Sequence, residues 1–382
     1  MKFPNLGSCF FFILFAAQCG FPTISEAVGI QLPGAPSSEN RFGFFIFGDS
    51  YVDVGNNNYI NTTSDFQANF PPYGESFFPV ATGRFTDGRN IPDFLGEYAN
   101  LPLLPPYLDP HNDLYDYGVN FASGGGGALA LSHQEQALGL QTQMKFFKRV
   151  DKSLRKKLGN ARTQSFFSNS VFLFNFGGND YLNPFDISYD IFKTIDAQEQ
   201  FVNMVIGNIT KALKEVYKHG GRKFGLMGVP PLGYMPSSRL KKSAQFFEEA
   251  SSIARLHNKL LPIALHKLSK QLKGFKYAFA DTHTLLLQRI LNPSRYGFKV
   301  VDTACCGSDE FRGVYNCGRK LGSLPFTHCK NLEDHMFFDS FHPTEKVFKQ
   351  LTEQMWSGGL EVVKPYNFKQ LFDYEPTTLA SQ

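Results

Sequence analysis

Short runs of consecutive apolar residues recur along the chain, and each run ends in a small or polar residue. A run without polar alternation is typical of a strand that is covered on both faces, as in a parallel sheet. The pattern therefore predicts five short, buried strands. They lie at residues 42–47, 117–122, 171–176, 223–228 and 277–280.

Segments with helical periodicity separate these runs. Apolar residues recur at steps of three and four over residues 141–158, 197–217 and 244–272, which predicts three long helices. Strands that alternate with helices form βαβ units, so we expect a doubly wound α/β domain with three layers, α/β/α. Residues 56–110 interrupt this alternation. They are rich in Pro, Gly, Asn and aromatic residues, and their length indicates a packed insertion with a functional role.

The first residues have the pattern of a secretory leader. One cation, Lys2, precedes an apolar run at residues 9–17, and Ser25-Glu26-Ala27 offers a cleavage site between small residues. The run is shorter than the roughly 20 residues that a membrane span requires. We expect residues 1–27 to be a signal peptide and 28–382 to be one domain without a transmembrane segment. Secretion to the extracellular space (the apoplast in a plant), or to another compartment of the secretory pathway, would follow.

Four cysteines remain after this leader, and they crowd into one segment. In an oxidising compartment they favour two disulfides, for which three pairings exist, and a bond between the neighbours Cys305 and Cys306 would be strained. Zinc binding is the alternative, but paired Cys-x2-Cys spacing is missing. The cysteines are Cys305, Cys306, Cys317 and Cys329. Asn61 and Asn208 begin N-glycosylation sequons.

Composition and charge narrow the functional classes. The chain is 42% apolar and 19% charged, which is typical of a globular protein and not of a disordered one. Its formal charge is only +4, and the longest block of cations is Arg155-Lys156-Lys157. We therefore expect no nucleic-acid partner.

Polar residues follow several predicted strands, at the edge where an open parallel sheet binds its ligands. Gly48-Asp49-Ser50 follows the first strand, "SGGGG" at 123–127 the second and "GGND" at 177–180 the third. Late in the chain, "FFDSFHPTE" places Asp339 three residues before His342.

Ser50, His342 and Asp339 form the set that a serine nucleophile needs, because a base must take its proton and a carboxylate must orient the base. One turn can carry both Asp339 and His342, and we expect helices to begin at Ser50 and near Pro343. An oxyanion could be bound by the N–H of Ser50, one N–H of residues 124–127 and the Asn179 amide. Taken singly, Gly48-Asp49-Ser50 also fits a helix cap, the glycine run a phosphate-binding loop, and "GGND" a turn. The prediction of a catalytic site therefore depends on the order in which these motifs occur together.

The motifs resemble a known family when they are taken together. "FGDS", "NFASGGGG", "GGND" and "DSFHPTE" resemble the four ordered blocks of the SGNH hydrolase superfamily. "FIFGDSYVDVGNNNYI", "PPYGESFFPVATGRFTDGRNIPDFL", "VPPLGYMP" and "CCG" resemble the plant GDSL esterase/lipase family, and the resemblance covers residues 42–358.

The resemblance implies a flavodoxin-like SGNH hydrolase fold with about five parallel strands. It implies Ser50 as nucleophile, Asp339 and His342 as its partners, and Asn179 as an oxyanion donor. The usual A-S-x-x-x-G pattern selects Gly127 as a further donor. Two positions depart from the family: Tyr51 replaces the Leu of "GDSL", and Tyr234 stands where many relatives have Cys.

The sequence thus predicts a secreted serine esterase or lipase that hydrolyses carboxylic esters through an acyl-enzyme. The expected partner is a small-molecule or lipid ester, and this chemistry requires no metal or cofactor. An acyltransferase that uses the same residues is the first alternative. A catalytically inactive accessory or binding protein with the same fold is the second.

Overall fold

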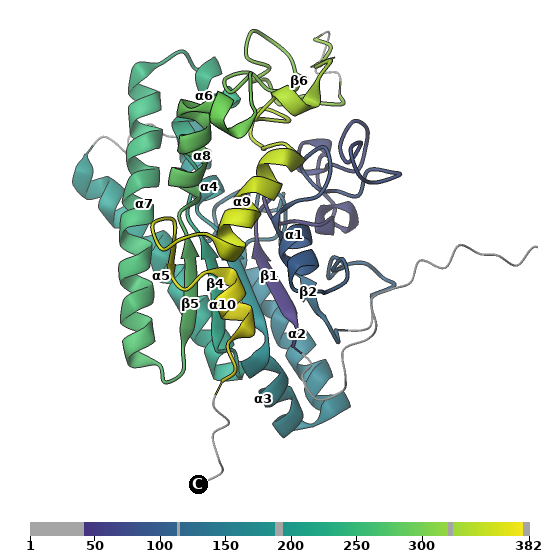
Figure 1. Cartoon of the computed structure of the whole chain (residues 1–382), viewed down its shortest axis with the longest axis vertical. Coiled ribbons are helices and arrows are strands. Elements are labelled where there is room, and N and C mark those ends of the chain that lie inside the picture. Colours follow the sequence, from purple (N-terminus) through teal and green to yellow (C-terminus); the bar gives the residue numbers. More distant parts are fainter. Residues whose placement is uncertain (1–41, 113–114, 188–193, 320–323, 377–382) are drawn as a thin grey trace, which may run out of the picture. The chain divides into compact units, whose positions relative to one another are not determined.

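A six-stranded sheet forms the centre of the computed structural model, which describes residues 42–112, 115–187, 194–319 and 324–376 (Figure 1). The strand order is β2-β1-β3-β4-β5-β8, and the first five strands are parallel. The predicted parallel strands are confirmed. They are β1 (Phe44–Gly48), β2 (Gly118–Asn120), β3 (Val171–Asn175), β4 (Lys223–Met227) and β5 (Lys276–Ala280).

The sixth strand was not predicted. β8 (Val363–Pro365) pairs antiparallel with β5 at the edge of the sheet. Its three residues include a lysine and a proline, so the sequence does not have the apolar pattern of a buried strand. Proline within a sheet is confined to such edge positions. The expected leader lies outside the described residues.

Helices cover both faces of the sheet, so the three-layer prediction is confirmed (Figure 1). One face carries α2 (Leu140–Leu158), α3 (Asn160–Asn169), α5 (Ile195–His219) and α7 (Ala244–Gln271). The other carries α1 (Ile91–Tyr98), α9 (Glu345–Ser357) and α10 (Phe368–Asp373), with α8 (Thr282–Leu291) beside α9. Two short helices, α4 (Gly178–Ile187) and α6 (Pro236–Leu240), follow β3 and β4.

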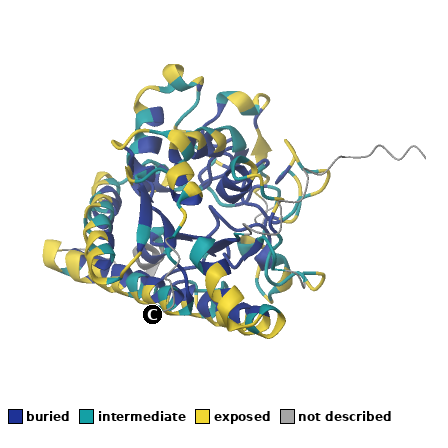
Figure 2. Cartoon of the chain, turned by 60° about the horizontal axis from the view of Figure 1, so that its bottom comes forward, coloured by how far each residue is buried: buried dark blue, intermediate teal, exposed yellow. Residues whose placement is uncertain are grey.

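The core is built on phenylalanines of the central strands. Phe45 and Phe47 point to one side of β1 and stack on Phe172 and Phe174 of β3, with ring centroids 5.1 and 4.7 Å apart. Every residue of β1 is buried, which requires helices on both faces of the sheet. Figure 2 shows the buried strands enclosed by helices whose outer faces are exposed.

The prediction of a helix that begins at Ser50 was wrong. The N–H groups of Val52 and Asp53 both donate to the carbonyl oxygen of Asp49, which forms a single turn. The Asp53 carboxylate then accepts the N–H of Asn56 (2.9 Å). This side-chain bond competes with helix continuation, because a short acidic side chain offers the backbone a local alternative partner.

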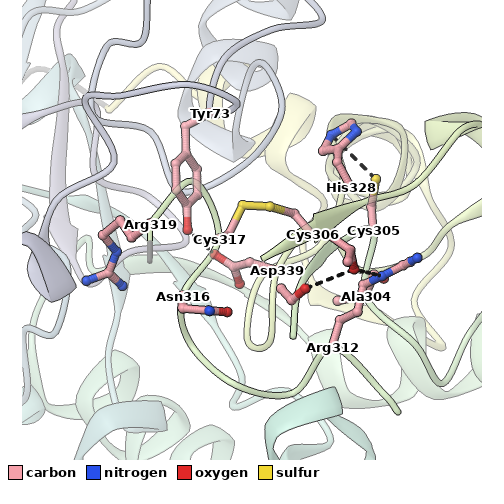
Figure 3. The surroundings of a disulfide bond; sticks show 12 residues. Tyr73, Ala304, Cys305, Cys306, Arg312, Asn316, Cys317, Arg319, His328 and Asp339 are labelled. Atoms are coloured by element: carbon pink, nitrogen blue, oxygen red, sulfur yellow. Dashed lines mark hydrogen bonds between the residues drawn. A yellow bond between two sulfur atoms is a disulfide. The ribbon is translucent and has the colours of Figure 1, made fainter. Parts of the chain in front are cut away.

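The four cysteines pair as Cys305–Cys329 and Cys306–Cys317. His328 lies 3.7 Å from the Cys305 sulfur, but both sulfurs of the first pair are in a disulfide and offer no thiolate to a metal. The N–H of Cys306 also donates to the carbonyl of Phe338, so this segment is tied to the loop that carries Asp339 (Figure 3).

The two sequons lie in different settings. Asn61 is exposed, whereas Asn208 is half-buried on α5 and its amide donates to the Met204 carbonyl (3.0 Å). None of the helices in the described ranges combines the length and the apolarity that crossing a bilayer requires.

Candidate active site

A cavity of about 560 Å³ lies at the carboxyl ends of the parallel strands. Segments that follow β1, β3 and β4 supply Ser50, Asn179 and Val229 to its lining, as expected for an open α/β sheet. Its walls are mainly apolar. The apolar side chains include Phe66, Phe85, Phe176, Leu182, Leu232, Met235, Phe246 and Phe341.

Ser50, His342 and Asp339 are joined in one chain of hydrogen bonds. The Ser50 hydroxyl oxygen lies 2.7 Å from Nε2 of His342, and Nδ1 of that imidazole lies 2.7 Å from Oδ1 of Asp339. All three side chains are buried. The structure thus brings together the three residues predicted as nucleophile, base and orienting carboxylate from opposite ends of the chain, at distances that proton transfer requires.

The Asp339 carboxylate is held by donors on both oxygens. Oδ1 accepts the N–H groups of Phe341 and His342, so a side chain closes the turn that the sequence led us to expect. Oδ2 accepts the Tyr73 hydroxyl at 2.8 Å. Burial acts to raise the pKa of Asp339, but the His342 charge and these hydrogen bonds outweigh it and hold the pKa below its usual value. Asp339 is therefore a carboxylate at neutral pH.

Tyr73 was missed by the sequence analysis, although it lies in the quoted block "PPYGESFF". It comes from the 56–110 insertion and is buried near the Cys306–Cys317 disulfide (Figure 3). No spacing rule links it to Asp339, which is 266 positions away.

Aromatic rings enclose the imidazole of His342. Phe85 and Tyr51 have ring centroids 5.2 and 5.9 Å from it. The Tyr51 hydroxyl also donates to the carbonyl of Phe341 (3.2 Å). The tyrosine that replaces the leucine of "GDSL" therefore fixes the loop that carries His342, in addition to lining the cavity.

The glycine loop after β2 contains the predicted donor Gly127, whose role stays a prediction. Gly124 and Gly125, rather than Gly127, are among the residues that line the cavity. Gly127 packs against Ser132, whose Cβ would be 2.2 Å from an added Cβ. The N–H of Gly124 is bonded to the Asp53 carboxylate (2.9 Å), whereas Gly125 has a positive φ of 81°. A run of four identical residues gives no register by which the sequence could have chosen.

The glycine loop is fixed from two sides. The Asn57 amide donates to the Gly124 carbonyl (2.9 Å), and the Ser123 hydroxyl donates back to Asn57. Beyond the loop, the Asp180 carboxylate accepts the N–H of Ala128 (2.8 Å). Asn57 thus positions the glycine loop. Asn179, next to Asp180, lines the cavity, and its amide donates to the Gly126 carbonyl (3.2 Å).

Asp49 is a second buried carboxyl group beside the cavity. Its Oδ1 accepts both the Asn175 amide (2.7 Å) and the N–H of Tyr51 (3.1 Å). Burial raises the pKa of Asp49 to about 7, although these hydrogen bonds and the His342 charge act to lower it. The folded protein therefore holds a proton on Asp49 that the unfolded chain loses above about pH 4.

Asp49→Asn is expected to flatten the dependence of stability on pH. Because the folded-state pKa is the higher one, the stabilisation is present below about pH 4 and is lost as the pH rises to about 7. The asparagine keeps the acceptor oxygen and removes the titration. We expect the fall in unfolding free energy between about pH 5 and pH 8, from urea titrations, to shrink by on the order of 2 kcal/mol.

The control for this experiment is Asp302→Asn, at an exposed position. It should leave the pH dependence as it is in the unmodified chain. Equal pH dependence in the unmodified chain and the Asp49 variant would contradict a buried proton on Asp49.

Comparison with known proteins places the chain in a family. A sequence model of the GDSL-like lipase/acylhydrolase family matches residues 44–355. The chain belongs to this family. It is 47% identical to a GDSL lipase of Tanacetum cinerariifolium, over 91% of this chain and 93% of that protein. It is 45% identical to GDSL esterase/lipase 1 of Arabidopsis thaliana, over 87% and 91% of the two chains.

Solved structures are more distant from this GDSL family member. An extracellular lipase of Streptomyces rimosus is 14% identical and aligns over 82% of this chain and 99% of that one, with a TM-score of 0.35. Phospholipase A1 of Streptomyces albidoflavus is 12% identical over 82% of this chain, also with a TM-score of 0.35.

Proposed function

We propose that this GDSL family member is a serine esterase or lipase in which Ser50 is the nucleophile, His342 the general base and Asp339 its orienting carboxylate. The hydrogen-bonded chain of these three side chains at a mainly apolar cavity carries the proposal. Membership of the family supports the same reaction class, carboxylic ester hydrolysis.

In this mechanism His342 Nε2 takes the proton of Ser50 as the hydroxyl oxygen attacks the ester carbonyl carbon. The tetrahedral intermediate collapses, the C–O bond to the alcohol breaks, and the imidazolium gives its proton to the departing alcohol. Water then attacks the acyl-enzyme with His342 as base, which releases the acid and restores Ser50. The carboxylate of Asp339 stabilises the imidazolium in both steps and is not itself protonated.

An active-site probe tests the proposal directly. The purified chain should hydrolyse p-nitrophenyl butyrate, and a fluorophosphonate should abolish that activity with a single adduct on the peptide that contains Ser50. Ser50→Ala provides the blank for labelling. Hydrolysis that persists after full labelling, or an adduct on another serine, would overturn the assignment of the nucleophile.

The oxyanion site we propose consists of the N–H groups of Ser50 and Gly125 and the side-chain amide of Asn179. These groups lie at the cavity, where donors aimed at a developing negative charge act in a partly water-free setting. One amide hydrogen of Asn179 is bonded to Gly126, which orients the other.

Asn179→Ala is expected to lower kcat for p-nitrophenyl butyrate by about 10²- to 10³-fold with little change in KM, because the donor acts mainly on the transition state. Asn203→Ala, at an exposed position of α5, is the matched control and should leave both constants unchanged. A kcat for Asn179→Ala within a factor of about two of the parent would exclude Asn179 from the oxyanion site.

We further propose that residues 1–27 direct the chain into the secretory pathway and are then removed. The two disulfides support this, since such bonds persist in oxidising compartments. After expression in a eukaryotic host that secretes proteins, the culture medium should contain a protein whose N-terminus lies near Val28. Treatment with a glycosidase should lower the mass of this protein. Retention of an intact N-terminus inside the cell would contradict secretion, and an unchanged mass would exclude glycans on Asn61 and Asn208.

A further inference from the structure

Positive charge is concentrated on one segment of the chain. Residues 140–169, which form α2 and α3, contain eight of the 38 Lys and Arg residues and one of the 34 Asp and Glu residues. The formal charge of this segment is therefore +7, whereas that of the whole chain is +4. The remainder of the protein is slightly acidic, so the charge is segregated rather than spread.

The cations of α2 form a stripe on its outer surface. Lys145, Arg149, Lys152 and Lys156 follow one another at steps of four, three and four residues, and all four are exposed. Such spacing places them on one face over about 16 Å of helix. The apolar residues of α2 occupy the opposite face, against the sheet. They are Met144, Phe147, Val150 and Leu154.

A second stripe lies on the neighbouring helix. Lys211, Lys214 and Lys218 of α5 are also exposed and recur at steps of three and four. α2 and α5 are in contact, joined by an ion pair between Lys148 and Glu215 (2.9 Å) and a hydrogen bond between His219 and Asp151 (2.8 Å). We call the seven side chains of the two stripes the basic face; the helices that carry them, α2 and α5, are labelled in Figure 1.

The acidic residues near the basic face do not neutralise it. Glu215 and Asp151 are engaged between the two helices. Within the described ranges, Lys218 is the one member of the basic face with a carboxylate within 4.0 Å. Cations at i and i+4 repel one another and weaken a helix, so an unpaired stripe has an energetic cost that an anionic partner would remove.

We propose that the basic face binds a linear, carboxylate-bearing polysaccharide. Lysines supply most of the charge, and they suit a flexible chain of regularly spaced anions, whose counterions are released on binding. The disulfides indicate an oxidising compartment, which favours an acidic polysaccharide over a nucleic acid. Binding there leaves the cavity open, because the cavity lies at the strand ends and the basic face on the outer surface of α2 and α5.

A membrane surface fits the basic face less well. Helices that bind in a bilayer interface combine cations with several apolar side chains that insert between lipids. The exposed positions of α2 are all polar or charged, and α5 exposes only Met204, seven residues before Lys211, and Ile195 at its start as large apolar side chains.

The test uses the full chain with Asn208→Gln, because a glycan on that residue would lie on α5 close to Lys211. Retention on immobilised polygalacturonate is measured at low salt (about 50 mM) and along a salt gradient. We expect binding that fades by about 0.5 M salt and is weakened at least about 10-fold by the triple variant Lys152→Glu, Lys156→Glu and Lys214→Glu.

The matched control reverses three exposed lysines on α9, β8 and α10, and so changes the net charge equally. They are Lys349, Lys364 and Lys369. This control should retain binding within about twofold. Both triple variants should hydrolyse p-nitrophenyl butyrate like the parent, which separates this proposal from that on the active site. Equal loss in both variants, no retention of the parent, or tighter binding to phosphatidylserine vesicles than to polygalacturonate would overturn the proposal.

Discussion

Asp339→Asn is expected to lower kcat for ester hydrolysis by about 10⁴-fold in a protein that still folds, as in other enzymes with a serine triad. The N–H groups of Phe341 and His342 require an acceptor at Oδ1, so the amide nitrogen of the asparagine must replace Oδ2. It would then meet the hydroxyl of Tyr73 and Nδ1 of His342, both of which donate in the native site. The substitution thus places an N–H donor beside Nδ1, leaves Oδ1 as the one acceptor for its proton, and removes the charge that stabilises the imidazolium.

Tyr73→Phe tests the same carboxylate with a smaller expected loss. It removes one donor to Asp339 and leaves the carboxylate charge, so we expect a loss of about 10-fold in kcat, in line with one hydrogen bond to a charged group. Steady-state kinetics with p-nitrophenyl butyrate, together with circular dichroism spectra, measure both effects. If Asp339→Asn lost less than about 10-fold, Asp339 would not be the orienting carboxylate.

Arg84→Met is expected to lower the free energy of unfolding by about 3–5 kcal/mol, because it strands a buried carboxylate. Arg84 donates through two nitrogens to the two oxygens of Asp93, each at 2.7 Å, and both side chains are at most 6% exposed. The same guanidinium donates to the Val54 carbonyl (3.2 Å). This pair therefore fixes the segment before Phe85 to α1 within the insertion, and urea titration measures its loss.

Two further variants serve as controls for this experiment. The double variant Arg84→Met with Asp93→Leu should lose less than Arg84→Met alone, since no unpaired charge remains. Lys299→Met breaks an ion pair with Asp334 (3.1 Å) in which the lysine is largely exposed, and we expect a change of at most about 1 kcal/mol. A comparable loss in Lys299→Met and Arg84→Met would contradict the special role of the buried pair.

The central strands and the residues of the triad could be predicted because their signals are local. β1 reads as an unbroken apolar run, and Asp339 and His342 are three positions apart. The features that could not be predicted depend on contacts between residues far apart in the sequence, or on a run of identical residues. Tyr73 meets Asp339 only in the folded chain, and four successive glycines do not reveal that Gly124 and Gly125 are the two at the cavity.

The choice between hydrolysis and acyl transfer was also beyond the sequence. Both reactions use Ser50, His342 and Asp339 in the same way, and they differ in whether water or another alcohol reaches the acyl-enzyme. That competition depends on access to a bound intermediate, which no single side chain encodes. The third possibility, an inactive binding protein, is disfavoured by the hydrogen bond between Ser50 and His342 (2.7 Å).

The wide separation of Ser50 from His342, 292 positions, has a consequence for synthesis of the protein. All five parallel strands emerge from the ribosome before the histidine does. A nascent chain therefore carries Ser50 for a long part of its synthesis without the imidazole that is hydrogen-bonded to it in the folded protein. Under the mechanism that we propose, the chain gains activity towards esters only after all five parallel strands have been made.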